Sequence, residues 1–304
     1  MRLAFVFPGQ GSQYIGMGQE LAQVFMEAAE VWGEADEVAG YSISSQCFFG
    51  EPAELNQTEY AQPAILTASL AALAVVRKFN IEPVMVAGLS LGEYTALVAA
   101  GVLTFKEALP LVKERARLMQ EAVPVGQGVM YAVLGMENTV VDEICRQGSG
   151  QVVIANYNAP GQVVIAGPKD EAEAAVQLLK EAGGKVKKLA MSVPSHSPMM
   201  LEAAKKLRPA LDKAPWKPAG VPVVSNVTAG LHSGDYAELL ERQLYSPVLW
   251  EQSVRFMLDQ VDGFIEIGPG NSLSGLIKKV GKNKVMGNID DFRSLEKILE
   301  KVNE

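Results

Sequence analysis

The feature that most constrains the fold is the stretch VMVAGLSLGEYTALVAAG, residues 84–101. An apolar run that predicts a buried strand leads into GLSLG, residues 88–92, and a helical pattern follows. The two glycines leave room for a sharp turn that lifts the Ser90 hydroxyl above the sheet edge, facing N–H groups at the helix start. The stretch therefore predicts a nucleophilic serine in an α/β fold. The alternative is a plain glycine-rich turn in which Ser90 caps the helix.

The rest of the chain supports an α/β architecture with two domains. Short apolar runs alternate with longer helical patterns, which is typical of layered α/β proteins. Between residues 124 and 193 the order β-α-β-β-α-β predicts a ferredoxin-like unit. We therefore expect a large α/β catalytic domain, formed by residues 1–123 and 194–304, with a small ferredoxin-like domain of residues 124–193 inserted into it.

Local patterns predict individual elements. The expected helices include residues 19–40, 61–79, 105–122 and 198–211, and the expected strands include residues 185–193, 221–227 and 263–270, with a pair of helices after the last strand. Thr104 and Glu107 form a capping-box pattern at the start of the third helix. Pro110 lies inside that helix, where we expect a kink or a break because proline lacks the backbone N–H.

The composition excludes several classes of protein. The net charge of −8 over 304 residues leaves no broad basic face for non-specific nucleic-acid binding. The N-terminal apolar run ends at Pro8, too early for a signal-peptide core, and no run of about eighteen apolar residues could span a membrane. Cys47 and Cys145 provide neither a disulfide framework nor a CxxC metal site. We therefore expect a cytoplasmic protein that binds no metal.

A nucleophilic serine needs a base, and the chain has only two histidines. His196, in SVPSHSPMM, lies where a strand is expected to end, and sites in α/β proteins form at the carboxyl ends of strands. We therefore predict that His196 is the base, the alternative being a histidine with local bonds at a helix start. His232, in the polar stretch TAGLHSGD, is predicted to be a solvated surface residue. No acid is adjacent to His196, so a carboxylate, an amide or a backbone oxygen could orient it.

Arg115 is a cation on an apolar, core-facing helix stripe, whereas Arg117 has polar neighbours and faces solvent. The neighbours of Arg115 at three and four positions are Leu111, Val112, Leu118 and Met119. A buried guanidinium needs an anion, which is either a structural carboxylate or the carboxylate of a substrate. Together with a serine nucleophile and a histidine base, Arg115 suggests transfer of an acyl group that carries a free carboxylate.

These residues lie in motifs that resemble one family over essentially the whole chain, the malonyl-CoA:acyl carrier protein transacylases. The motifs, in order, are FVFPGQGSQ, GLSLGEY, RLMQEAVP, NYNAPGQVVIAG, SVPSHS, RQLYSPVLW and EIGPGNSLSGL. The resemblance implies a large α/β-hydrolase-like domain with a parallel sheet and an inserted ferredoxin-like domain. It also implies that Ser90 is acylated, that His196 is its base and that Arg115 binds the malonyl carboxylate. In that family a carbonyl oxygen at the position of Gln243 orients the histidine.

The glycine-rich stretch FPGQGSQYIGMG, residues 7–18, fits no phosphate-binding fingerprint. The third glycine of GxGxxG would fall on Tyr14, and the GK[ST] ending of a P-loop is missing. The resemblance instead implies that the backbone N–H groups of Gln10 and Leu91 form an oxyanion hole. Many members of the family have histidine before the serine, where this chain has Leu89, and we expect this difference to change the pocket lining and not the chemistry.

The implied reaction moves a malonyl group from malonyl-CoA to Ser90 and then to the phosphopantetheine thiol of acyl carrier protein, with no cofactor of the enzyme's own. Two lysine-rich segments, residues 180–188 and 278–284, are candidates for carrier docking, and solvated lysines are the alternative. The competing hypotheses are a serine hydrolase, such as a thioesterase of the α/β-hydrolase type, and a non-catalytic docking module. A preference for malonyl over methylmalonyl groups and the oligomeric state stay open.

Overall fold

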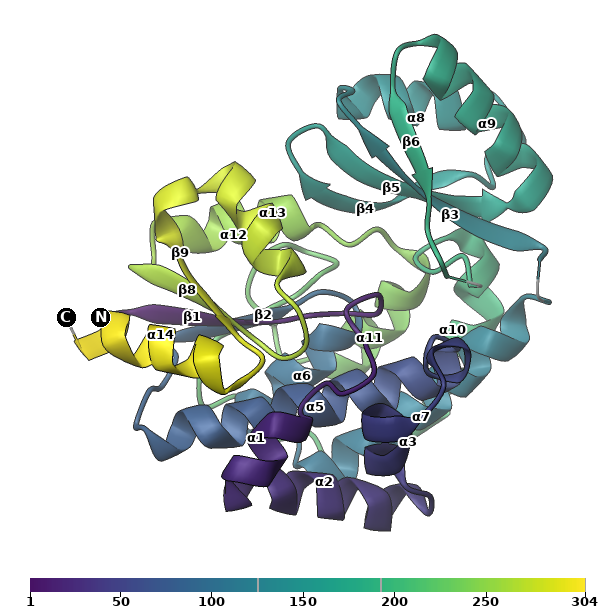
Figure 1. The fold of residues 1–304 in the computed structure, drawn as a ribbon. Helices are drawn as coiled ribbons and strands as arrows, with labels where there is room; N and C mark the ends of the chain where they lie inside the picture. The colour runs from purple at the N-terminus through teal and green to yellow at the C-terminus, as the bar shows by residue number, and fades with distance from the viewer. Residues whose placement is uncertain (125, 192, 304) are drawn as a thin grey trace.

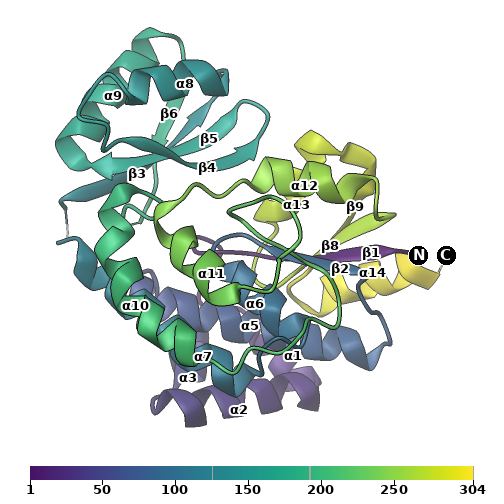
Figure 2. The same ribbon diagram turned by 180° about the vertical axis from the view of Figure 1, so that it is seen from behind.

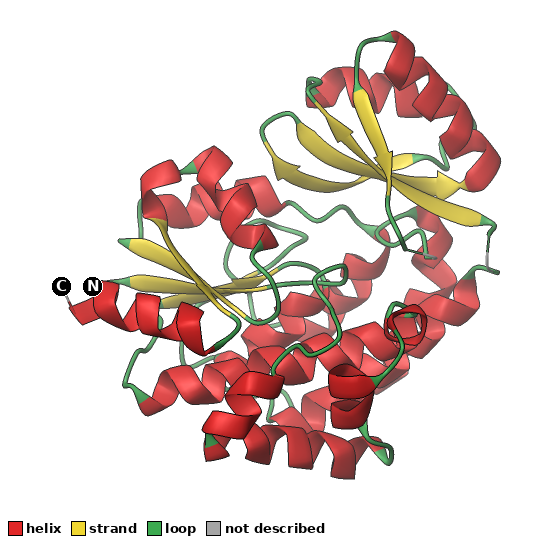
Figure 3. Ribbon diagram, viewed as in Figure 1, coloured by secondary structure: helices red, strands yellow, loops and turns green. Residues whose placement is uncertain are grey.

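Two separate β-sheets organise the computed structural model, which describes residues 1–124, 126–191 and 193–303 (Figure 1). The larger sheet belongs to the domain that contains both termini, and the smaller one forms a separate lobe above it (Figure 3). Val125, Ser192 and Glu304 fall within the expected domain ranges but lie outside the described residues. An α/β fold with a parallel sheet and a small ferredoxin-like domain is confirmed.

The larger sheet has five parallel strands. Their order is β7 (Val223–Val224), β2 (Met85–Gly88), β1 (Leu3–Phe7), β8 (Gly263–Ile267) and β9 (Val285–Ile289). Alternate residues of β1 face opposite sides of the sheet, as strand geometry requires. Phe5 and Phe7 pack into the core with the N-terminal helices, whereas Ala4 and Val6 pack with the helices of the C-terminal part. The sheet is therefore buried on both faces, as parallel sheets usually are.

Helices cover both faces of this sheet (Figures 1 and 2). They are α1 (Gln19–Val24), α2 (Met26–Ala39), α3 (Ile43–Phe49), α4 (Pro52–Leu55), α5 (Thr58–Lys78), α6 (Leu91–Ala99), α7 (Phe105–Ala122), α10 (Leu201–Lys213), α11 (Tyr236–Tyr245), α12 (Trp250–Leu258), α13 (Ser272–Val280) and α14 (Phe292–Asn303), with short 3₁₀ turns at Pro198–Met200 and Lys282–Lys284. α12 and α13 lie on the face opposite α5 and α6. By length and composition α5 could span a membrane, but 83% of its apolar window is buried inside the protein, so it is the central core helix.

The small domain contains β3 (Gly128–Leu134), α8 (Asn138–Cys145), β4 (Val153–Ala159), β5 (Gln162–Pro168), α9 (Lys169–Glu181) and β6 (Lys185–Lys188). The antiparallel sheet has the order β4-β5-β3-β6, the ferredoxin-like arrangement. One face of the sheet, including Val133 and Val163, packs against α8 and α9. The other face, including Met130 and Val164, is turned toward the large domain and lines a cleft.

Several predicted elements differ from the structure. The helix expected over 19–40 is two helices, because Phe25 between them is extended and its ring contacts the rings of Phe79 and Phe292. The expected strand at 221–227 forms pairs only at 223–224, and that at 185–193 only at 185–188 among the described residues. The chain after β8 contains an unpredicted edge strand, β9, whose Gly287 adopts a φ of 150°.

The helix that contains Pro110 was predicted to begin with a capping box and to kink or break at the proline. The capping box of Thr104 and Glu107 is present, with both reciprocal hydrogen bonds formed. α7 nevertheless continues through Pro110 to Ala122, so the expected break is wrong. Proline removes a single backbone donor, and the buried side chains on the same helix face hold the helix together around it.

Candidate active site

Ser90 lies at a strained turn between β2 and α6. Its φ of 55° and ψ of −106° are unusual for a residue with a side chain, and strain of this kind persists only where the surrounding structure enforces it. A Cβ on Gly88 would lie 1.9 Å from the Gly92 backbone, and one on Gly92 would lie 2.1 Å from the Phe7 carbonyl oxygen. The two glycines therefore let the strand, the turn and the helix approach one another closely enough to form a nucleophile elbow.

The Ser90 side chain makes none of the contacts expected of a helix cap. Its Oγ lies 2.8 Å from His196 Nε2 and accepts a hydrogen bond of 3.1 Å from Arg115 Nη2. It forms no capping hydrogen bond with α6. The structure thus brings together the three residues that the sequence singled out, although they are widely separated along the chain.

His196 is oriented by a backbone carbonyl. Its Nδ1 lies 2.7 Å from the main-chain oxygen of Gln243, which can only accept, so Nδ1 carries the proton and Nε2 is free to accept from Ser90. Burial lowers the pKa of His196 to about 4, and the charge of Arg115 contributes in the same direction. The imidazole is therefore neutral at pH 7, the state that a general base requires.

Arg115 is completely buried in α7. Its Nη1 donates to Gln62 Oε1 over 2.6 Å, and its Nη2 donates to Gln243 Oε1 over 2.9 Å as well as to Ser90. Among the described residues no carboxylate forms an ion pair with it. The internal ion pair that the sequence left open is therefore not formed. The guanidinium therefore carries a positive charge beside Ser90, and no carboxylate in the described part of the chain neutralises it by direct contact.

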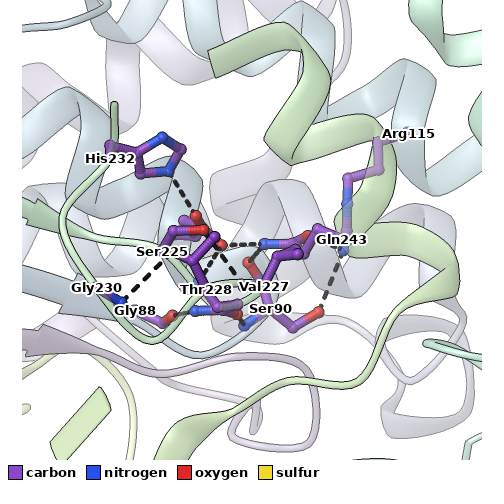
Figure 4. Close-up of polar contacts among 11 residues, drawn as sticks. Gly88, Ser90, Arg115, Ser225, Val227, Thr228, Gly230, His232 and Gln243 are labelled. Carbon is purple, nitrogen blue, oxygen red and sulfur yellow. Dashed lines mark hydrogen bonds and ion pairs between the residues drawn. The ribbon is translucent and has the colours of Figure 1, made fainter. Parts of the chain in front are cut away.

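The prediction for His232 is wrong. Its side chain is only 2% exposed, and its Nε2 lies 2.7 Å from Glu93 Oε1 (Figure 4). The ring also packs against Tyr236, with centroids 5.1 Å apart. The loop that carries His232 is polar, but it folds over the start of α6, so the residue is buried by a contact that local sequence does not show.

The residues predicted for the oxyanion hole lie at the same cleft. Gln10 and Ser90 line a cavity of about 120 Å³, whose opposite wall comes from the small domain, and Leu91 is the first residue of α6. Neither backbone N–H donates a hydrogen bond to another described residue. A Cβ on Gly9 would lie 2.4 Å from the Leu89 carbonyl oxygen, so glycine allows the loop before Gln10 to approach the elbow. Leu89 itself lines the cavity, as expected.

The other predicted features are peripheral to the cleft. Lys180 and Lys188 are exposed at the small domain, while Lys279 and Lys284 donate to Gln162 Oε1 and to the Val261 carbonyl oxygen. No group of three or more potential metal ligands occurs among the described residues. Cys47 and Cys145 are both buried free thiols.

Three polar residues of this region were not found from the sequence. Gln62 is a buried polar residue of the mostly apolar helix α5, and its Oε1 accepts from Arg115. Asn226 follows the short strand β7, and Glu93 is in the first turn of α6. Asn226 Oδ1 accepts from the Ser90 N–H over 2.6 Å. The rule that sites form at the carboxyl ends of parallel strands could have identified Asn226, because it lies two residues after the end of β7.

Comparisons with known proteins identify the family to which the chain is similar. The acyl transferase domain family matches residues 4–295. A malonyl CoA-acyl carrier protein transacylase of Bacillus subtilis (strain 168) is 45% identical over 311 residues, which cover 100% of this chain and 98% of the relative.

Solved structures of malonyl-transacylases are also similar to the whole chain. A malonyl CoA-acyl carrier protein transacylase from Clostridium perfringens has a TM-score of 0.95 and 42% identity, with 100% of this chain and 98% of that chain covered. A malonyl-transacylase solved in complex with a type II PKS acyl-carrier protein has a TM-score of 0.96 and 42% identity, with 99% and 100% covered. The likeness therefore extends over both domains.

Proposed function

The chain belongs to the malonyl CoA-acyl carrier protein transacylases, and we propose that Ser90, His196 and Arg115 are the groups with which it works. The protein is a malonyl-CoA:acyl carrier protein S-malonyltransferase of fatty acid synthesis, with malonyl-CoA and acyl carrier protein as its partners. The observation that supports these roles best is the position of Ser90 Oγ, 2.8 Å from a buried neutral histidine and 3.1 Å from a buried arginine. No carboxylate among residues 1–124, 126–191 and 193–303 forms an ion pair with that arginine.

The first half of the reaction acylates Ser90. His196 Nε2 takes the hydroxyl proton while Oγ attacks the thioester carbonyl carbon of malonyl-CoA. The backbone N–H groups of Gln10 and Leu91 donate to the oxyanion of the tetrahedral intermediate. When that intermediate collapses, the carbon–sulfur bond breaks and coenzyme A leaves with the proton from His196.

The second half reverses these steps with another thiol. The phosphopantetheine thiol of acyl carrier protein gives its proton to His196 and attacks the malonyl-serine ester. Ser90 regains its proton as the ester breaks, and the malonyl group leaves on the carrier. Arg115 holds the malonyl carboxylate in both halves, because a planar guanidinium suits a carboxylate. The main-chain oxygen of Gln243 keeps the histidine in the required tautomer throughout.

Residues 1–123 and 194–304 form the catalytic domain and residues 124–193 form the small domain. The enzyme needs no cofactor of its own, because the partner carries the phosphopantetheine, and it acts in the cytoplasm. The lysine-rich segments 180–188 and 278–284 are the candidate faces for an acidic carrier.

Labelled malonyl-CoA tests the serine intermediate. With radiolabel in the malonyl group and no carrier present, we expect label on the wild-type chain and none on Ser90→Ala. Adding holo acyl carrier protein should remove the label much faster than water does, with the label recovered on the carrier. Loss of label to water at the same rate with and without carrier would contradict the transfer mechanism and favour the hydrolase hypothesis.

A further inference from the structure

We infer that Glu93 is a positioning residue: it sets the orientation of the Gln243 side-chain amide and, through that amide, the placement of Arg115 beside Ser90. The inference rests on the proposed function, because it concerns the same carboxylate-binding site. Glu93 is the third residue of α6, three positions after Ser90, and its side chain is completely buried. This carboxylate takes part in none of the proposed proton transfers at Ser90 and His196.

The Gln243 side chain joins the parts of the site. Its Oε1 accepts from Arg115 Nη2 over 2.9 Å. Its Nε2 donates to the Ser90 carbonyl oxygen over 3.0 Å and to Glu93 Oε2 over 2.6 Å. Figure 4 shows Gln243 between Arg115 and Ser90, with His232 on the far side of the contacts. One amide thus bonds to the serine backbone and to the arginine.

The orientation of this amide decides whether those contacts attract or repel. If the amide were reversed, its NH₂ group would face the guanidinium of Arg115, and both groups can only donate. Its oxygen would face the carbonyl of Ser90 and the carboxylate of Glu93, which can only accept. Because Glu93 is an acceptor without a donor, it favours the orientation in which Gln243 presents its oxygen to Arg115.

Three contacts hold the Glu93 carboxylate itself. Oε1 lies 2.7 Å from His232 Nε2, and Oε2 accepts from the backbone N–H of Asn226 over 3.3 Å as well as from Gln243. The position near the start of α6 also favours a negative charge, since the N-terminal end of a helix carries partial positive charge. His232, which the sequence predicted to be on the surface, therefore belongs to the support of the site.

The same contacts reach the turn at Ser90. Asn226 donates from Nδ2 to the Gly88 carbonyl oxygen over 2.6 Å and accepts at Oδ1 from the Ser90 N–H over 2.6 Å. Its backbone N–H is fixed by Glu93. Glu93 therefore contacts both the residue that holds the strained serine backbone and the residue that contacts Arg115, which no other carboxylate among the described residues does.

Glu93→Gln tests this role. Glutamine has nearly the same shape, but it offers one acceptor and one donor, so it tolerates either orientation of Gln243. We expect the ratio of kcat/KM for malonyl-CoA to that for acetyl-CoA to fall about tenfold, because only malonyl-CoA has a carboxylate for Arg115 to bind. An effect that acts through Ser90 itself changes both substrates alike and leaves the ratio unchanged. Glu93→Asp keeps an acceptor-only group and should retain more of this ratio than Glu93→Gln, although it fills the space less well.

A purely structural role for Glu93 predicts the opposite order, since the isosteric Gln would then be the milder change. Glu266→Gln is the matched control: Glu266 is also buried and accepts from the backbone N–H groups of Leu273 and Ser274, but it contacts no residue of the site. It should change thermal stability and leave the substrate ratio unchanged.

His232→Phe gives an independent measurement if Glu93→Gln does not fold. Phenylalanine keeps the ring against Tyr236 but removes the donor to Glu93, and we expect the substrate ratio to fall about threefold. An unchanged ratio in every folded variant would overturn the positioning role while the wild-type enzyme still transfers malonyl. A wild-type chain that transfers no malonyl would overturn the proposed function, and the positioning role with it.

Discussion

The two walls of the cleft at Ser90 differ in polarity and hydrogen bonding. The large-domain wall is polar and closely hydrogen-bonded: Ser90, His196 and Arg115 contact one another or share Gln243. The small-domain wall is mostly apolar, with Met130 and Val164 among its residues. In the small domain one sheet face is covered by helices and the other is left to form this wall.

We interpret the polar wall as the source of the reacting groups and the small-domain wall as the surface that shapes the cleft. Hydrogen-bonded groups that must be placed to within a fraction of an ångström come from the rigid edge of a parallel sheet and the helices beside it. The small-domain wall offers mainly apolar surface, with Asn156 and Asn158 as polar residues among its lining. Substitutions on the polar wall should therefore change the rate and the choice of acyl group, and substitutions on the apolar wall should change affinity.

The largest effect is expected for Arg115→Ala on the polar wall. If Arg115 binds the malonyl carboxylate as proposed, loss of this buried charge should lower kcat/KM for malonyl-CoA on the order of 10²–10³-fold. Activity with acetyl-CoA should fall far less, so the preference for malonyl is lost. Steady-state kinetics with both substrates measure this.

Arg117→Ala is the control for this change. Arg117 lies on the same helix but is exposed, and it pairs with Glu114 and Glu121. It should leave both substrates unaffected. If Arg115→Ala lowered the activity with the two substrates equally, Arg115 would have a structural role and the polar wall would not select the acyl group.

The polar wall also shows how far sequence reasoning reaches. Ser90 could be predicted because the strand, the turn and the helix are adjacent in sequence, and His196 because the chain has so few histidines. The role of Gln243 came only from the family resemblance, since a backbone carbonyl has no residue signature. His232 was predicted wrongly and Glu93 was missed because their burial depends on a contact between segments 139 positions apart.

The fold shows the same limit. The ferredoxin-like order of the small domain is readable because its strands and helices follow one another with clear periodicity. In contrast, β9 contains Gly287 and Asn288, which are poor strand formers, and it is a strand because it pairs with β8. The break at Phe25 likewise reflects ring contacts with Phe79 and Phe292, not a local signal.

The second-largest effect is expected in the pH dependence of kcat/KM. Burial and then the charge of Arg115 lower the pKa of His196 to about 4 from 6.5, so at pH 5 about nine-tenths of the free enzyme keeps a neutral base. An unperturbed histidine would be only about 3% neutral at that pH, a difference of about thirtyfold. We expect kcat/KM to stay nearly level down to about pH 5. Measurement with acetyl-CoA avoids titration of the malonyl carboxylate.

The same shift acts on stability, with a defined sign. The unfolded chain binds a proton at His196 below about pH 6.5, whereas the folded chain resists it until about pH 4. The contribution of this group therefore lowers stability as the pH falls from about 6.5 toward 4. Circular dichroism at each pH must show a folded enzyme. An acid limb near pH 6.5 in folded protein would mean that His196 is not held neutral as described.

The smallest effect is expected on the apolar wall, from Val164→Ala. Removing part of a buried side chain that faces the cleft should raise KM a few-fold and leave kcat within about twofold. The reason is that this side chain should contact the bound substrate and the transition state to a similar extent. Val163→Ala is a matched control on the same strand, since Val163 faces α8 and α9 instead. Both variants should lose similar stability, about 1–2 kcal/mol, but only Val164→Ala should change KM. A fall in kcat as large as that of Arg115→Ala would show that the apolar wall also positions the reacting groups, and the division between the walls would not hold.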